Sequence, residues 1–99
     1  MAEVGTDPGT ILSRELPIIN RKGLHARATA KFVQCVERFD AAVTVSRAGE
    51  TVGGTSIMGI LTLGAGIGSS IVVTTSGSDA QGAMDAIAAL VANRFGEDE

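Results

Sequence analysis

The spacing of apolar residues changes several times along this chain, and each change marks a new element of secondary structure. Alternation of apolar and polar residues is typical of strands, whereas apolar residues three and four positions apart are typical of helices. These stretches follow one another in the order strand, helix, strand, strand, helix, strand, helix. The predicted ranges are, in that order, 11–19, 26–38, 42–46, 50–54, 57–63, 71–75 and a last helix that starts at Ser78 or Asp79.

This order predicts an α+β sandwich, in which a four-stranded antiparallel sheet carries three helices on one face. Pro17 cannot donate a backbone hydrogen bond, so the first strand is expected at an edge of the sheet. The strands at 42–46 and 50–54 are expected to pair as a hairpin. Ser78 and Gln81 have the spacing of a capping box, which would begin the last helix. The 99 residues suffice for one domain, and with only three aromatic residues its core must be mainly aliphatic.

Charge and cysteine content narrow the functional classes. The formal net charge is −3 and the pI is near 5.0, which argues against a nucleic-acid-binding surface. Cys35 is the single cysteine, so it cannot form an internal disulfide, and its apolar neighbours predict a buried structural thiol. The sequence has no apolar N-terminal run of the length of a signal peptide or membrane span. We therefore expect a cytoplasmic protein.

The two ends and one internal loop are expected to lie outside the regular elements. Residues 1–10 lack apolar periodicity and are expected to form a flexible extension before a domain that spans 11–95. Residues 96–99 form a short acidic tail that is expected to be solvated. The glycine-rich stretch 64–69 is not a phosphate-binding loop, because it lacks the Lys-Ser/Thr ending and leads into a strand.

The chain has one histidine, His25, and it lies where a glycine-containing turn meets the first predicted helix. The first N–H groups of a helix have no intrahelical partners and carry the positive end of the helix dipole, so this position favours phosphate binding. Arg27 adds a guanidinium that can bind phosphoryl oxygens. Both features disfavour protonation of the imidazole. The pattern predicts a neutral, nucleophilic histidine that accepts a phosphoryl group.

Two segments carry a family resemblance. Gly23-Leu24-His25-Ala26-Arg27, followed by Ala30-Lys31-Phe32-Val33, resembles the active-site segment of HPr, the histidine phosphocarrier of the phosphoenolpyruvate-dependent phosphotransferase system. The second segment, 55–64, resembles the regulatory-serine helix of the same family, and the likeness covers roughly residues 11 to 95. One position departs from the family pattern: Ala28 stands where a proline is usual. Proline would pre-set the helical φ, so its absence could loosen the turn that holds His25.

The resemblance implies the same open-faced sandwich and a carrier role rather than an enzyme activity. His25 would accept a phosphoryl group at Nδ1 from phospho-Enzyme I and pass it to a IIA-type acceptor, with Arg27 balancing charge on the group in transfer. No cofactor or metal is expected. Ser56 resembles the serine that an HPr kinase phosphorylates, although a serine before an apolar run is equally consistent with a plain helix N-cap. Monomer is the default for a small carrier that must fit several partners.

Partner binding is expected to involve the short helix at 57–63, because it has too many apolar residues for one thin helix to bury. Ile57, Met58 and Leu61 resemble the exposed docking patch of the family, and the alternative is that they belong to the core. Four cations gather in sequence near His25 and could meet an acidic partner: Arg21, Lys22, Arg27 and Lys31.

Two other functional classes compete with the phosphocarrier. One is a regulatory or protein-binding module in which His25 is merely a turn residue and the apolar helix meets a partner. The other is a hydrolase with His25 as general base, which is the weakest because no carboxylate lies near His25 in sequence to orient the imidazole. The sequence leaves open whether the pathway concerns sugar transport or nitrogen.

Overall fold

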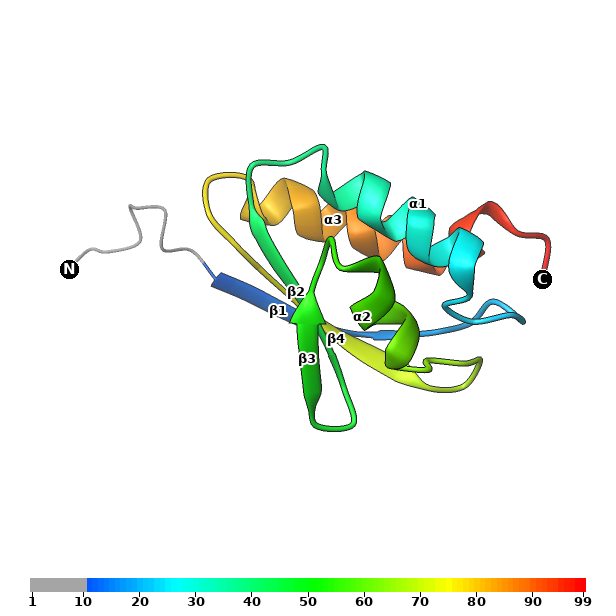
Figure 1. The fold of residues 1–99 in the computed structure, drawn as a ribbon. Helices are drawn as coiled ribbons and strands as arrows, with labels where there is room; N and C mark the ends of the chain where they lie inside the picture. Colours follow the sequence, from blue (N-terminus) through cyan, green and yellow to red (C-terminus); the bar gives the residue numbers. More distant parts are fainter. Residues whose placement is uncertain (1–10) are drawn as a thin grey trace.

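The computed structural model describes residues 11–99 (Figure 1). The expected extension at 1–10 lies outside the described residues. The elements are β1 (Ile11–Pro17), α1 (Ala26–Val36), β2 (Ala42–Arg47), β3 (Glu50–Gly53), α2 (Ile57–Thr62), β4 (Ser70–Ser76) and α3 (Ala80–Ala92). A single helical turn over Arg94–Gly96 follows α3.

The four strands form one antiparallel sheet in the order β1-β4-β2-β3. β1 is an edge strand, as predicted from the missing N–H of Pro17. Pro17 lies opposite Ser70 of β4. β2 and β3 form the predicted hairpin, and Arg47 faces Glu50 across a two-residue turn. Ala48 and Gly49 in that turn both have positive φ, the pattern of a type I′ turn, which matches the twist of the strands it joins.

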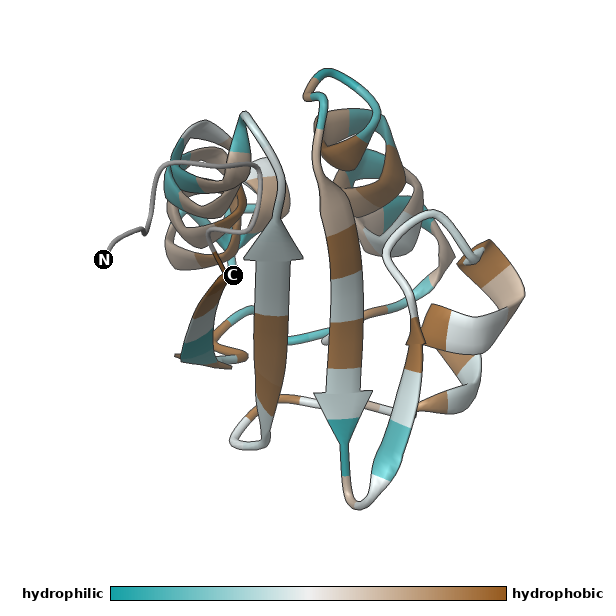
Figure 2. Cartoon of the chain, turned by 90° about the vertical axis from the view of Figure 1, so that its left-hand side faces the viewer, coloured by the Kyte–Doolittle hydropathy of each residue, from teal (hydrophilic) through white to brown (hydrophobic). Residues whose placement is uncertain are grey.

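The three helices cover one face of the sheet, which confirms the predicted sandwich. Figure 1 shows α1 and α3 side by side over the sheet, with α2 next to β3. Buried and more exposed residues alternate along β2, and Figure 2 shows the matching bands of hydropathy on the strands. The largest fully buried side chains come from every layer: Phe32, Phe95, Ile18, Ile60, Ile71, Met84 and Ile87.

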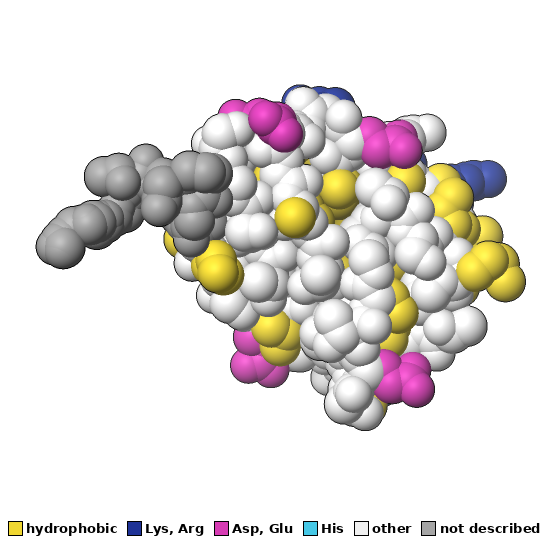
Figure 3. All heavy atoms as spheres, turned by 60° about the vertical axis from the view of Figure 1, so that its left-hand side comes forward, with side chains coloured by type: hydrophobic (Ala, Val, Ile, Leu, Met, Phe, Trp, Pro, Cys, Tyr) yellow, Lys and Arg dark blue, Asp and Glu magenta, His cyan; other side chains and the backbone are white. Residues whose placement is uncertain are grey.

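Hydroxyl side chains are frequent on the strands of the sheet. Hydroxyl pairs join neighbouring strands, as between Ser13 of β1 and Thr74 of β4, and between Ser46 of β2 and Thr51 of β3. Figure 3 shows apolar side chains in small groups among uncharged polar ones, with acidic side chains toward the rim of that view. Between residues 11 and 99, no helix is both long enough and apolar enough to cross a membrane.

The start of α3 differs from the prediction, whereas Cys35 lies where it was expected. The predicted capping box of Ser78 and Gln81 does not form, so that prediction is wrong. Ser78 Oγ instead donates to Asp40 Oδ2 at 3.1 Å, and Gln81 donates to Asp85 at 2.9 Å. The N-cap of α3 is Asp79, whose carboxylate accepts from the backbone of Asp40 and so ties the helix to the loop before β2. Cys35 is buried as expected, and burial raises the pKa of its thiol.

Candidate functional site

The loop between β1 and α1 is held against the loop that precedes β4. Leu24 N–H donates to Ala65 O at 2.9 Å, and the Leu24 side chain is buried. Gly23 has a φ of 65°, and a Cβ there would lie 2.5 Å from Ala65 O. Only glycine fits this position without displacing backbone, because both the left-handed conformation and the close approach exclude a side chain. The glycine turn therefore sets where the next residue, His25, lies.

His25 is the N-cap of α1, as predicted. Its backbone is extended, with φ −74° and ψ −178°, and its C=O accepts from Thr29 N–H at 2.9 Å. Its Nδ1 accepts from Arg27 N–H at 3.3 Å. Ala28 is fully buried in the first turn, and that turn is formed in the absence of proline. One ring nitrogen of His25 thus lies at the positive end of the helix dipole.

The other ring nitrogen faces a carboxylate from the far end of the chain. His25 Nε2 is hydrogen-bonded to Glu97 Oε2, and Glu97 Oε1 accepts from Asn20 Nδ2 at 3.1 Å. Asn20 is fully buried and also donates to Gly23 O at 2.8 Å. The hydrogen bond from His25 is the main cause that lowers the pKa of Glu97 from its ordinary value of 4.5, against the opposing effect of burial.

This contact corrects the expectation for the tail and adds a carboxylate from a distant part of the sequence. The tail at 96–99 is not simply solvated, because the Glu97 side chain is only 18% exposed. A carboxylate does orient the imidazole, although it is separated from His25 by 72 positions. Sequence reasoning missed both Glu97 and Asn20. The one sequence signal for Glu97 was Phe95, a large apolar residue just before the acidic run, which is now seen fully buried.

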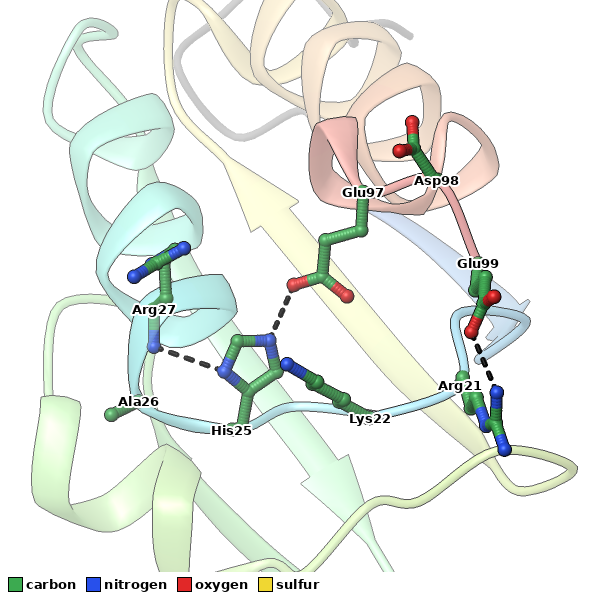
Figure 4. Close-up of a pocket in the computed structure, with 8 residues that line it drawn as sticks. All are labelled: Arg21, Lys22, His25, Ala26, Arg27, Glu97, Asp98 and Glu99. Atoms are coloured by element: carbon green, nitrogen blue, oxygen red, sulfur yellow. Dashed lines mark hydrogen bonds and ion pairs between the residues drawn. The ribbon is translucent and has the colours of Figure 1, made fainter.

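An open pocket of 640 Å³ surrounds the ring, and Figure 4 shows His25 between the backbone of Arg27 and the carboxylate of Glu97. Arg21 and Glu99 form an exposed ion pair at 2.7 Å on the rim. The charge of Lys22 helps to lower the pKa of Glu97. The charged residues that line the pocket come from two parts of the sequence. The cations precede or begin α1, and the carboxylates follow α3: Arg21, Lys22 and Arg27, and Glu97, Asp98 and Glu99.

The fourth expected cation, Lys31, has a different contact. Its Nζ donates to Phe95 O at 2.7 Å and so joins α1 to the turn after α3. In the part of the chain that the structure describes, no three His, Cys, Asp or Glu side chains are grouped as metal ligands. The chemistry that the pocket offers comes from the imidazole, the backbone amides at the helix start and the surrounding charges.

The short helix α2 divides its apolar residues between core and surface. Ile60 and Leu63 are buried, Leu61 is half-buried, and Ile57 and Met58 are 44% and 71% exposed. The expectation that some of them face outward therefore holds.

The exposed residue Ser56 lies at the start of this helix. Ser56 is the N-cap of α2, and its Oγ accepts from Gly59 N–H at 3.2 Å. α2 packs against α1, the helix that His25 caps. An outward apolar surface and a capping serine are thus carried by a direct neighbour of the histidine helix.

Comparison with known proteins places the chain in one family. The family model described as "PTS HPr component phosphorylation site" matches residues 12–93. The chain is 53% identical over 89 residues to the phosphocarrier protein HPr of Cupriavidus necator, covering 90% of this chain and 100% of that protein. It is 40% identical over 88 residues to the phosphocarrier protein NPr of Shewanella violacea, covering 89% and 97%. The crystal structure of HPr-C-His from Thermoanaerobacter tengcongensis matches with a TM-score of 0.85 and 34% identity, covering 89% and 99%. The chain therefore belongs to the HPr family of phosphocarrier proteins.

Proposed function

We propose that this chain is a covalent intermediate in a phosphotransferase relay, which accepts a phosphoryl group on His25 from phospho-Enzyme I and passes it to a IIA-type acceptor. The observation that carries the proposal is the place of His25 Nδ1, which faces the Arg27 amide at the start of α1 and borders an open pocket. An approaching phosphoryl group meets the positive end of the helix dipole there. Family membership as a phosphocarrier supports the same role.

The transfer step needs positioning and charge balance more than proton transfer. The lone pair of His25 Nδ1 forms a bond to phosphorus while the P–N bond of the donor phosphohistidine breaks and the donor ring leaves with that electron pair. Nδ1 exchanges its contact with the Arg27 amide for the phosphoryl group, and the amide can then donate to a phosphoryl oxygen. The exposed guanidinium of Arg27 balances the charge on the group in transfer. Passing the group onward reverses these events.

Partners dock on the exposed part of α2. Ile57 and Met58 give this surface its apolar character, and half-buried Leu61 adds to it. Lys31 lies on α1 and adds positive charge for acidic partners, although its contact with Phe95 O restricts it. Enzyme I and the acceptor then bind the same surface one after the other. A monomer leaves this surface accessible to both partners, and such a carrier would work in the cytoplasm.

Phosphorylation of Ser56 would regulate this docking. Its hydroxyl is exposed at the start of α2 and next to the apolar surface. A phosphate there adds up to about two negative charges, which a helix N-terminus tolerates but an acidic partner does not. Regulation by an HPr kinase would therefore act through local electrostatics rather than refolding.

The general-base hypothesis gains an orienting carboxylate from Glu97, but among residues 11–99 no thiol lines the pocket for His25 to activate. The thiol of Cys35 is buried in α1, and burial raises its pKa. The half-buried imidazole itself lines the open pocket. This arrangement favours a histidine that is phosphorylated over a histidine that activates another group.

The test is incubation of the purified protein with phosphoenolpyruvate and active Enzyme I, followed by phosphorus NMR. We expect an acid-labile phosphohistidine signal in the wild type and no such signal in His25→Ala. A Glu37→Ala variant, changed at an exposed position at the far end of α1, serves as the matched control and should be phosphorylated normally. No signal in the wild type, with a donor shown to be active, would refute the carrier role and favour a protein-binding module.

A further inference from the structure

We propose that Glu97 is a positioning residue for phosphoryl transfer, which keeps the ring proton of His25 on Nε2 and thereby leaves the lone pair of Nδ1 free to react. The inference rests on the proposed function, because it assumes that Nδ1 is the acceptor. It assigns a role to the segment after α3, which none of the sequence patterns had connected to the histidine.

The first support is that both oxygens of the Glu97 carboxylate have a partner. Oε2 accepts from His25 Nε2, and Oε1 accepts from Asn20 Nδ2 at 3.1 Å. Asn20 is itself fully buried and is fixed by its second hydrogen bond, to Gly23 O at 2.8 Å. The carboxylate is therefore held in one orientation by the same loop that carries His25, which is the arrangement that orients imidazoles in other sites.

The second support is the backbone that brings Glu97 to the ring. Arg94, Phe95 and Gly96 have φ values of 55°, 55° and 78°, three consecutive residues in the left-handed region. For the two residues other than glycine this conformation is strained, and it persists only where the surroundings enforce it. Here Phe95 is fully buried in the core, and Lys31 Nζ donates to its carbonyl at 2.7 Å. The fold thus maintains a strained turn whose result is the contact between Glu97 and His25.

The hydrogen bonds on the two ring nitrogens agree with one tautomer. Nδ1 accepts from the Arg27 amide, which can only donate, so Nδ1 carries no proton. Nε2 faces an ionised carboxylate, which can only accept, so Nε2 carries the proton. A ring with the proton on Nδ1 would fit neither partner. The geometry therefore selects the nitrogen that is free to attack.

The same contact stabilises the ring during transfer. When the Nδ1 lone pair forms the bond to phosphorus, the ring still carries the Nε2 proton and becomes positively charged. The Glu97 carboxylate lies against that proton and balances the charge, and the proton stays on Nε2 until the group leaves and the electron pair returns to Nδ1. The other charged groups around the ring are Lys22, Arg21 and Arg27 on the cationic side, and Asp98 and Glu99 on the acidic side.

Glu97→Gln is the informative variant. Asn20 can only donate through Nδ2, so the new amide should turn its oxygen toward Asn20 and its NH₂ toward His25. That NH₂ would donate to Nε2 in place of the lost acceptor, so the share of rings with the proton on Nδ1 should rise, at the expense of the contact with the Arg27 amide. Asp98→Asn is the matched control, since Asp98 is exposed, lines the same pocket and loses the same charge.

The experiment has two readouts on the full chain. Nitrogen-15 NMR of the imidazole, at about pH 8.5 where an ordinary histidine is neutral, reports which ring nitrogen holds the proton. Rapid-quench assays with phospho-Enzyme I report the rate of transfer to His25. We expect the proton on Nε2 in the wild type and in Asp98→Asn, a shift toward Nδ1 in Glu97→Gln, and transfer slowed by about tenfold or more in Glu97→Gln alone.

Other results would overturn the inference. If Glu97→Gln keeps both the wild-type tautomer and the wild-type rate, Glu97 does not position the ring. If the tautomer shifts without any effect on the rate, the contact is structural only, and if the rate falls equally in Asp98→Asn, pocket charge rather than positioning is responsible. Failure of the wild type to take up phosphate would instead refute the proposed function, and the inference with it.

Discussion

The imidazole of His25 and the carboxylate of Glu97 are hydrogen-bonded across 72 positions of the chain. The contact joins the start of α1 to the segment that follows α3, so the pocket around His25 is lined by residues from the loop and first turn of α1 and from the C-terminal segment. Because the carboxylate also reaches buried Asn20, a change at any of these three residues is expected to affect the other two.

Arg27→Ala should slow transfer to and from His25 by on the order of tenfold to a hundredfold, because a charge-assisted contact to the phosphoryl group is lost. The side chain is exposed, so the free energy of unfolding should change by less than about 0.5 kcal/mol. Rapid-quench kinetics and urea unfolding test the two statements separately. A variant that transfers phosphate at the wild-type rate would remove Arg27 from the mechanism.

Ser56→Asp should weaken binding to Enzyme I, because it adds a negative charge beside Ile57 and Met58. Ser56→Asn is the control, since it keeps an oxygen that can cap α2 and adds no charge. Calorimetric titration of each variant with Enzyme I gives the affinities. Equal affinities for the Asp and Asn variants would show that charge at this position does not regulate docking.

Gly23→Ala should destabilise the fold by at least about 1 kcal/mol, because the residue has a left-handed φ and the new Cβ would meet Ala65 O. Relief of that clash would move the loop that carries His25, so phosphorylation should slow as well. Gly66→Ala, in the neighbouring loop, adds a Cβ in open space and should be nearly neutral. Urea unfolding of both variants makes the comparison, and equal stabilities would contradict this account of the turn.

The contact between Glu97 and His25 should make stability depend on pH in the acid range. The pKa of Glu97 is lowered in the folded protein, so the unfolded chain binds its proton first as the pH falls. The stabilisation is fully present above the ordinary value of 4.5 and is lost as the pH falls through the lowered pKa. Urea unfolding at about pH 7 and about pH 3 should show a smaller acid loss in Glu97→Gln than in Asp98→Asn. The same loss in both variants would exclude Glu97 as its source.

Local patterns in the sequence were enough to predict the order of the elements and several positions within them. Alternation and helical spacing predicted both ends of every strand and of the first two helices to within a few residues, and the start of the last helix equally well. The missing N–H of Pro17 placed β1 at an edge, and the glycine turn placed His25 at a helix start. These features depend on neighbours within a few positions, which a sequence displays directly.

The tertiary structure alone decided which distant groups meet at the site. The acidic run at 97–99 reads as a solvated tail, and nothing in its own composition distinguishes Glu97 from Asp98 or Glu99. The difference arises because buried Phe95 and its left-handed backbone turn the chain back toward Asn20 and His25. Likewise, Ser78 bonds to Asp40 instead of capping its own helix, because folding brings that loop within reach. Such contacts depend on how the whole chain packs, so they cannot be predicted from local periodicity.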